Sequence, residues 1–261
     1  MLIYLCLSSH GYGHATRQAC ILKALYRIRP NWIYVVSSDA DYNFLKLIFR
    51  HIPVVFRNVR WDVGMIQENA LNNNKIKTIK AIKSLENKLP ANIIKEVNWL
   101  AKYKEKICIL ADIPPSASEL SRLLSVPLIW MANFGWDDIY NHFGGFLADY
   151  ANQIKFQYMS GDYLLRLPFS LPMNWGLKEE NISITASEPQ EISKDLEKIL
   201  EPYKGRIISI AFGGLGLNLD SDLFSKWKSY IFLGFRNSKN NLEKSTLPSN
   251  FISIPDNYRL I

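Results

Sequence analysis

The residues best suited to chemistry lie in one short segment, SHGYGHATR at residues 9–17. The segment follows an apolar run and opens a helical pattern, so we expect a strand, a tight glycine loop and a helix. A helix start offers free N–H groups to an anion and favours a neutral imidazole, which can take a proton from a hydroxyl. We therefore predict that His14 is a general base. The alternative is that the glycines only form a tight connection between strand and helix and that His14 has a structural role. The candidates for substrate contact in this segment are His10, Gly11, Gly13, Thr16 and Arg17.

The predicted partner of His14 is Asp112. This aspartate ends the apolar run at 107–111 and precedes the chain break at Pro114 and Pro115. Because the carboxyl ends of parallel strands lie at one edge of a sheet, Asp112 is expected near His14, where it would orient the imidazole. An aspartate that only terminates its strand and begins a turn is the alternative.

A second group of candidates follows the apolar run at 127–131. Asn133, Trp136 and Asp137 are candidates for substrate binding, and the indole of Trp136 could stack on the apolar face of a bound ring such as a sugar. The alternative is a capped helix start, in which Asn133 or Asp137 is the N-cap residue. Arg166 precedes a proline-rich turn and is a candidate for substrate binding, or else for an ion pair with a carboxylate.

Apolar runs and helical spacings define the frame that must position these residues. The runs are continuous rather than alternating, and amphipathic helical patterns separate them. This arrangement indicates an α/β fold with a doubly wound, Rossmann-like parallel sheet that is covered on both faces. In such folds ligands bind at the carboxyl ends of the strands. The strands are expected at residues 2–8, 32–36, 54–56, 107–111, 127–131 and 163–166.

The pattern restarts after a polar stretch, so we predict a first domain at 1–188 and a partial second Rossmann-like domain at 189–261. Gly213 and Gly214 follow an apolar run there and are predicted to approach the phosphates of a donor. About three strands are fewer than the ~4 to 6 of a usual open sheet, so this domain is expected to be truncated and to self-associate through its edge. A helix is expected to start near Pro189, and strands at 206–212, 230–235 and 251–254.

Composition narrows the classes of protein further. The 261 residues are 48% hydrophobic and 21% charged, which is typical of a globular protein. No apolar run approaches the ~20 residues of a membrane helix, so a cytoplasmic protein is expected. The net charge of +7 comes largely from nine lysines between Lys75 and Lys106. Apolar residues recur among them at the spacing of one amphipathic helix, at Ile76, Ile79, Ile82, Leu85 and Leu89, so the lysines are expected on a solvated helix face rather than on a nucleic-acid surface. Reduced, buried thiols are expected at Cys6, Cys20 and Cys108.

Several motifs together resemble a known family. The pattern HGYGHATR at 10–17 is similar to the first loop of two-Rossmann (GT-B) glycosyltransferases, and more specifically to the glycosyltransferase-like N-terminal region of plant arabinokinases. Further matching segments follow in the same order and extend the resemblance over nearly the whole chain. They are VNWL at 97–100, LADIPPSA at 110–117, NFGWDDIY at 133–140, LLRLPFSLPM at 164–173, FGG at 212–214 and LPSNFISI at 247–254.

The resemblance implies transfer of a sugar from a nucleotide-sugar donor to a small hydroxyl acceptor, with His14 as the base and no metal or cofactor. It also implies that the first domain holds the acceptor, and that residues holding the nucleotide lie later in the second domain than Ile261. We therefore expect a hexosyltransferase-type enzyme whose activity is impaired in this chain alone.

Two other classes remain open from the sequence. One is a non-catalytic sugar or nucleotide-sugar binding protein, or a remnant of an enzyme. The other is an NAD-linked Rossmann enzyme, since Asp39 lies about where a ribose-binding acid would follow the glycines. The third glycine of that fingerprint is missing, because Thr16 occupies its position.

Overall fold

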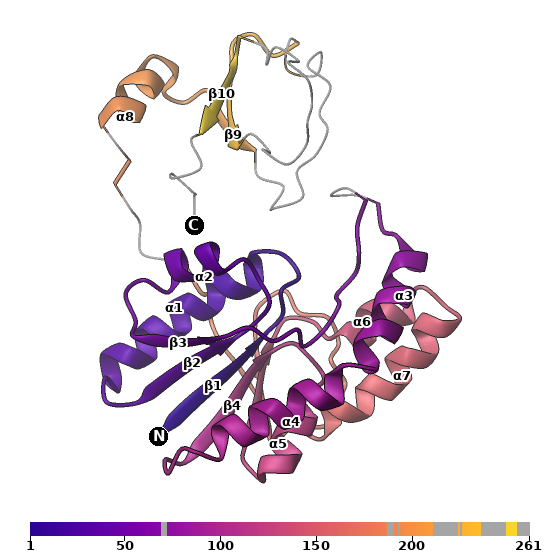
Figure 1. Ribbon diagram of the computed structural model, residues 1–261. Helices are drawn as coiled ribbons and strands as arrows, with labels where there is room; N and C mark the ends of the chain where they lie inside the picture. The colour runs from indigo at the N-terminus through magenta and orange to yellow at the C-terminus, as the bar shows by residue number, and fades with distance from the viewer. Residues whose placement is uncertain are drawn as a thin grey trace. The chain divides into compact units, whose positions relative to one another are not determined.

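The computed structural model divides the chain into two compact units (Figure 1). The first contains Met1–Ile66 and Asn74–Ala186, and the second contains Gln67–Asn73 and Ser187–Ile261. The predicted boundary at 188 falls in a stretch outside the described residues and stays a prediction. The residues that the structure describes are 1–68, 72–186, 191–192, 194–210, 224, 226–235 and 249–254.

A seven-stranded sheet forms the centre of the first unit, with the strand order β3-β2-β1-β4-β5-β6-β7. Every neighbouring pair is parallel, which confirms the predicted doubly wound α/β class. The strand order reverses between β1 and β4, so their carboxyl ends are the expected place for a ligand. The strands are β1 (Leu2–Leu7), β2 (Ile33–Ser37), β3 (Val54–Arg57), β4 (Ile107–Asp112), β5 (Leu128–Ala132), β6 (Tyr163–Arg166) and β7 (Lys178–Asn181).

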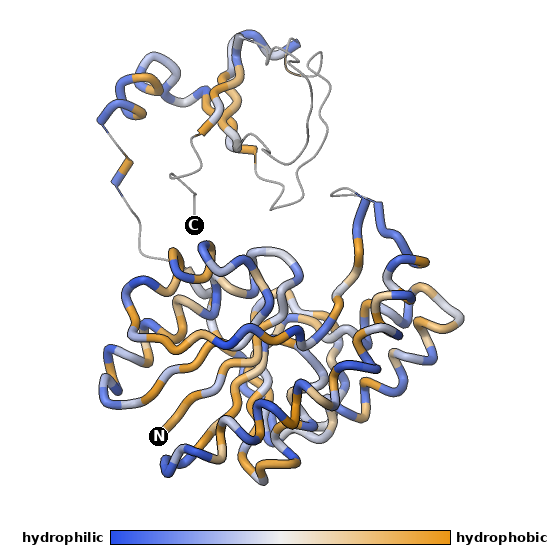
Figure 2. The backbone as a smooth tube through the Cα atoms, viewed as in Figure 1, coloured by the Kyte–Doolittle hydropathy of each residue, from blue (hydrophilic) through white to orange (hydrophobic). Residues whose placement is uncertain are grey.

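Helices cover both faces of this sheet (Figure 1). On one face α1 and α2 enclose an apolar cluster that includes Leu5, Leu22 and Phe44. On the other, α3 to α7 enclose a larger cluster that is rich in tryptophan and tyrosine. Figure 2 shows the same division, with apolar strands inside and hydrophilic helix surfaces outside. The helices are α1 (Gly13–Ile28), α2 (Tyr42–Ile48), α3 (Lys75–Glu86), α4 (Leu89–Leu100), α5 (Ala117–Leu124), α6 (Trp136–Asn141) and α7 (Phe146–Met159).

Two details of the first unit correct the sequence analysis. The strand β7 was missed, because all four of its residues, Lys-Glu-Glu-Asn, are exposed at the sheet edge and carry no apolar pattern. The pattern at 76–89 is not one helix: α3 ends at Glu86, and Leu89 starts α4 with a proline in its first turn. Ile76 is 69% exposed and is therefore not part of the buried face.

The second unit contains a three-stranded parallel sheet in the order β10-β9-β8. One apolar cluster of this unit contains Leu200, Leu233 and Ile254, and Phe224, Ile231 and Phe232 are buried as well. The strand predicted at 206–212 was expected to be buried, but three of the four residues of β8 are exposed. The elements are α8 (Lys194–Leu200), the short 3₁₀ helix η1 (Glu201–Tyr203), β8 (Ile207–Ile210), β9 (Ile231–Phe235) and β10 (Phe251–Ile254).

The remaining expectations concern side-chain exposure. All nine lysines between Lys75 and Lys106 are exposed, as a solvated helix face requires. The cysteines are free, but only Cys6 is fully buried, since Cys20 and Cys108 are partly accessible. Within the described ranges, no helix has the length and the apolar character needed to cross a bilayer.

Candidate active site

The loop between β1 and α1 positions the central histidine of the site. Gly11 has φ +77°, a left-handed conformation that glycine adopts without strain. The helix begins at Gly13, so His14 lies in its first turn. In the parallel register of β1 and β4, Leu7 pairs with Asp112, and this pairing brings the end of β4 beside the loop.

His14 and Asp112 meet at this sheet edge in a direct hydrogen bond. The Nδ1 atom of His14 lies 2.8 Å from Oδ1 of Asp112, and the two side chains are almost fully buried. Because an ionised carboxylate only accepts, Nδ1 carries the proton in this bond. The Nε2 atom is then the nitrogen that can act as a base.

Two more side chains hold the carboxylate of Asp112. Arg17 donates from Nε to Oδ2 at 2.5 Å and from Nη2 to Oδ1, and Gln18 donates from Nε2 to Oδ2 at 2.8 Å. Burial raises the pKa of Asp112, but the charges and hydrogen bonds of Arg17 and His14 outweigh it and lower the pKa to about 2. Asp112 is therefore an anion at any pH at which the protein would be assayed.

Arg17 and Asn133 were expected to contact substrate, and the structure gives them another role. Arg17 donates from Nη1 to the side-chain oxygen of Asn133 at 2.7 Å, in addition to its bonds with Asp112. Its Nη2 atom also lies 2.9 Å from Nδ1 of His14. Both side chains therefore belong to the hydrogen-bond network around Asp112, and their contact with substrate stays a prediction.

Trp136 and Asp137 are the second correction among the expected sugar contacts. Trp136 is 2% exposed, its ring stacks on Tyr140, and its Nε1 donates to Asp62 at 2.8 Å, so its faces are not open to solvent. Asp137 is 7% exposed and accepts from Trp175. Burial raises the pKa of Asp137. Neither Asn133 nor Asp137 is the N-cap residue of α6, because Gly135 occupies that position.

Arg166 and Thr16 also have partners within the chain. Arg166 forms an ion pair of 2.7 Å with Glu179 and donates to the carbonyl of Leu171, which ties β6 to β7. This is the alternative that the sequence left open for it. Thr16 donates to the carbonyl of Gly13 at 3.1 Å, a contact within the first turn of α1.

Three polar residues near the loop were missed by the sequence analysis. Asp62 is 7% exposed and accepts hydrogen bonds from Ser8 at 3.0 Å and from Trp136, and burial raises its pKa to about 6. Ser8 and Gln18 were missed as well, because neither residue belongs to a sequence pattern that indicates a functional role. Asp62 follows the end of β3, which is the one signal that could have indicated it.

His10 lies against this group. Its ring meets the ring of Trp136 edge-on, with 5.0 Å between centroids. Burial, together with the nearby His14, lowers the pKa of His10 to about 4. His10 is therefore a neutral imidazole at neutral pH, and its contact with substrate stays a prediction.

The structure describes Asp39, the candidate for an NAD-linked enzyme, but not the two glycines that were predicted to contact the donor. Asp39 follows β2 and lies 3.6 Å from Arg60 in a partly exposed ion pair. Gly213 and Gly214, predicted to approach the donor phosphates, lie outside the described residues. No group of three or more histidine, cysteine or acidic side chains is arranged to bind a metal within the part of the chain that the structure describes.

Comparisons with known proteins agree with this architecture. No family model matches the chain. It is 25% identical over 257 residues to L-arabinokinase of Arabidopsis thaliana, a match that covers 95% of this chain and 24% of that protein. A UDP-glucose:anthocyanidin 3-O-glucosyltransferase solved with UDP superposes with a TM-score of 0.61 at 14% identity, over 90% of this chain and 66% of its own. UGT89C1 of Arabidopsis thaliana, also solved with UDP, superposes with a TM-score of 0.60 at 9% identity, and the match covers 97% of this chain and 70% of that chain.

These likenesses confirm the resemblance to GT-B proteins as a likeness of fold. At such low identities they establish the arrangement of strands and helices and no particular reaction. The chain spans about a quarter of the length of the curated relative that it matches.

Proposed function

We propose that this chain is a glycosyltransferase-type protein that transfers a sugar from a nucleotide-sugar donor to a hydroxyl group of a small acceptor, with His14 as the general base. The observation that carries the proposal is the 2.8 Å hydrogen bond between His14 Nδ1 and Asp112 at the carboxyl edge of a doubly wound sheet. A base held by a buried carboxylate is the arrangement that proton abstraction from a hydroxyl requires.

The reaction can be written from the protonation states at this site. Nε2 of His14 takes the proton of the acceptor hydroxyl while that oxygen forms a bond to the anomeric carbon of the donor. The bond from this carbon to the diphosphate oxygen breaks, and the nucleoside diphosphate leaves with the electron pair. A single displacement of this kind inverts the configuration at the anomeric carbon. Asp112 stays ionised throughout and stabilises the imidazolium that forms.

The donor class in this proposal is a UDP-sugar. Two of the solved structures of similar fold contain UDP. On this chain the predicted phosphate contacts are Gly213 and Gly214, and they stay a prediction.

The test is an assay of the purified chain with a panel of UDP-sugars and small alcohols, read out as UDP release and as glycoside formation. His14→Ala should lower the rate at least about 100-fold, since a general base contributes about 10²- to 10⁴-fold. His51→Ala, at an exposed histidine remote from the loop in sequence, is the matched control and should leave the rate unchanged. A His14→Ala rate within a few-fold of the parent would refute His14 as the base.

A second candidate function is a non-catalytic nucleotide-sugar binding protein. The observation that favours it is the 5% exposure of His14, whose ring also meets Phe134 edge-on at 5.6 Å between centroids. If this function is the correct one, UDP-sugars bind in calorimetry with similar affinity to the parent and to His14→Ala, and neither protein forms glycoside.

A further inference from the structure

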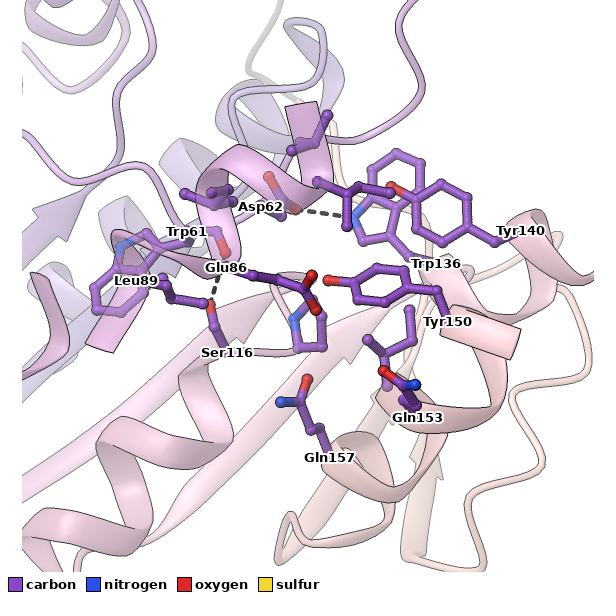
Figure 3. Close-up of a pocket in the computed structure, with 15 residues that line it drawn as sticks. Trp61, Asp62, Glu86, Leu89, Ser116, Trp136, Tyr140, Tyr150, Gln153 and Gln157 are labelled. Atoms are coloured by element: carbon purple, nitrogen blue, oxygen red, sulfur yellow. Dashed lines mark hydrogen bonds between the residues drawn. The ribbon is translucent and has the colours of Figure 1, made fainter. Parts of the chain in front are cut away.

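A cavity of about 100 Å³ lies on the face of the sheet that α3 and α7 cover, apart from the site described above (Figure 3). Neither His14 nor Asp112 lines it. The ring of Phe134 lies between the two places, with centroids 5.6 Å from His14 and 5.2 Å from Trp136, and Trp136 lines the cavity. The cavity is therefore a second place where a small molecule could bind.

Aromatic rings form much of its wall. Trp61, Trp136 and Tyr140 line it, and each of these rings is at most 2% exposed. The rings are held in place by buried hydrogen bonds, from Trp61 Nε1 to Ser37, from Trp136 Nε1 to Asp62 and from Tyr140 to a backbone carbonyl. These buried rings pack against one another and close the inner end of the cavity, so contact with a ligand falls to the polar side chains nearer the opening.

Polar side chains without partners complete the lining. Glu86 and Tyr150 point toward one another across the opening, and Gln153 and Gln157 lie beside them (Figure 3). Within the described part of the chain, none of these four side chains has a hydrogen-bond partner. Burial, followed by the Glu86 and Asp62 carboxylates, raises the pKa of Tyr150 well above its ordinary value, so its hydroxyl keeps its proton and can donate. Glu86 and Gln153 are exposed to water, whereas Tyr150 and Gln157 are partly buried. The Tyr150 hydroxyl and the Gln157 amide are therefore the groups that most favour a ligand with hydroxyl groups of its own.

The charges of the lining select among such ligands. Asp62 and Glu86 are acidic, and no lysine, arginine or histidine lines the cavity. Phosphates and carboxylates would meet only repulsion there, so the cavity does not suit the diphosphate of a nucleotide sugar. Its volume is also far below the roughly 300 to 1,000 Å³ of sites for drug-sized ligands, which restricts it to about one ring.

We propose that this cavity is a binding site for one uncharged monosaccharide or ring polyol, held by hydrogen bonds from Glu86, Tyr150, Gln153 and Gln157. The site is independent of the proposed transfer reaction at His14. Asp62 connects the two regions, because the same carboxylate accepts from Trp136 in the cavity wall and from Ser8 at the start of the loop that carries His14.

The experiment is a titration of the full chain with D-glucose, D-galactose, L-arabinose and myo-inositol, followed by calorimetry and by saturation-transfer NMR. At least one of these should bind, and its phosphorylated counterpart should bind at least tenfold more weakly because of the two carboxylates. Failure of all four neutral ligands to bind at about 10 mM, or tighter binding of a sugar phosphate, would overturn the proposal.

Variants locate the binding. Tyr150→Phe keeps the ring and removes the hydroxyl, and Gln157→Leu keeps the side-chain volume, so each should weaken binding about 2- to 12-fold. Tyr163→Phe, on β6 and outside the lining, is the matched control and should change nothing. His14→Ala should also leave binding unchanged, which separates this site from the proposed function. Equal effects of the two Tyr→Phe variants, or loss of binding in His14→Ala, would place the sugar elsewhere.

Discussion

At the scale of single residues, the charge state of the site depends on Arg17 more than on the histidine. The guanidinium contacts both oxygens of Asp112 and one oxygen of Asn133, so it neutralises a carboxylate that is completely buried. A buried carboxylate without its cation would either bind a proton or destabilise the fold. Arg17 therefore makes it possible for Asp112 to be ionised and to hold His14.

Replacing Arg17 should be costly for stability. Arg17→Met keeps much of the apolar stem and removes the donors, and we expect it to lower the free energy of unfolding by about 3 kcal/mol because a buried ion pair is broken. Urea denaturation measures the change. Arg122→Met removes an exposed pair with Glu119 and should have no measurable effect. Similar midpoints for the two variants would contradict the assigned role of Arg17.

Asp62 gives a prediction of pH dependence with the opposite sign from that of Asp112. Its pKa is raised to about 6 in the folded state, so the folded protein binds a proton that the unfolded chain releases near its ordinary pKa. The contribution of Asp62 to stability is therefore present below pH 4 and is lost as the pH rises from about 4 to about 6. Asp112, with its lowered pKa, loses its contribution as the pH falls toward 2.

Comparison of the parent with Asp62→Asn isolates this effect. Between pH 4 and pH 7 the stability of the parent should decline relative to the variant by up to about 3 kcal/mol, since one pKa unit corresponds to about 1.4 kcal/mol. Urea denaturation at several pH values measures the difference. Parallel curves for the two proteins over this range would show that Asp62 has no raised pKa.

At the scale of elements, two loops from distant parts of the chain form the site edge. Gly64, with φ +65°, lies so close to His10 that a Cβ atom there would be 2.6 Å from the imidazole ring. The carbonyl of the same glycine accepts from Tyr140 in α6. The loop after β3 therefore holds the loop after β1 by steric fit at Gly64, in addition to the hydrogen bond from Ser8 to Asp62.

Two glycine substitutions separate the steric effect from the backbone effect. Gly64→Ala should lower the free energy of unfolding by about 1 kcal/mol or more beyond Gly176→Ala, because both have similar positive φ but only Gly64 lacks room for a methyl group. Gly176 has φ +69° and no atom within 4 Å of an added Cβ. Thermal or urea denaturation gives both values, and equal losses would mean that His10 moves away without cost.

At the scale of the whole molecule, the two units differ in their described cores. The first unit has two extended apolar clusters, one on each face of the seven-stranded sheet. The second has a described cluster of Leu200, Leu233 and Ile254, and the residues of β8 are mostly exposed. Since burial of apolar surface is the main favourable term in folding, the first unit should be much the more stable of the two.

Limited proteolysis tests this difference. A brief digestion should leave a resistant fragment that ends near residue 186, while sites from about residue 205 onward are cleaved early, because local opening is easier where few apolar contacts hold the backbone. Mass spectrometry of the fragments identifies the ends. Simultaneous loss of both units would show that the second is stabilised as strongly as the first.

The sequence by itself determined the fold class and the location of the catalytic candidates. Continuous apolar runs need burial on both faces, so β1, β4 and β5 could be placed within a residue or two and the parallel sheet followed. The pairing of His14 with Asp112 was also predictable, because both residues lie at strand ends and parallel strands end at one edge. These are consequences of local pattern and of a general rule of topology.

Only the tertiary structure decided what each polar side chain does. Arg17, Asn133 and Trp136 have types that suit a sugar or a phosphate, yet the side chain of each forms a hydrogen bond with a residue about 70 to 120 positions away. Asp62 and Gln18 gain their roles in the same way, from partners far along the chain. The edge strand β7 was not predictable either, since an exposed strand needs no apolar pattern and is defined by its pairing with β6. Residue types and spacing fix what a side chain is able to bind, but the packing of distant elements fixes which partner it meets and how much water remains around it.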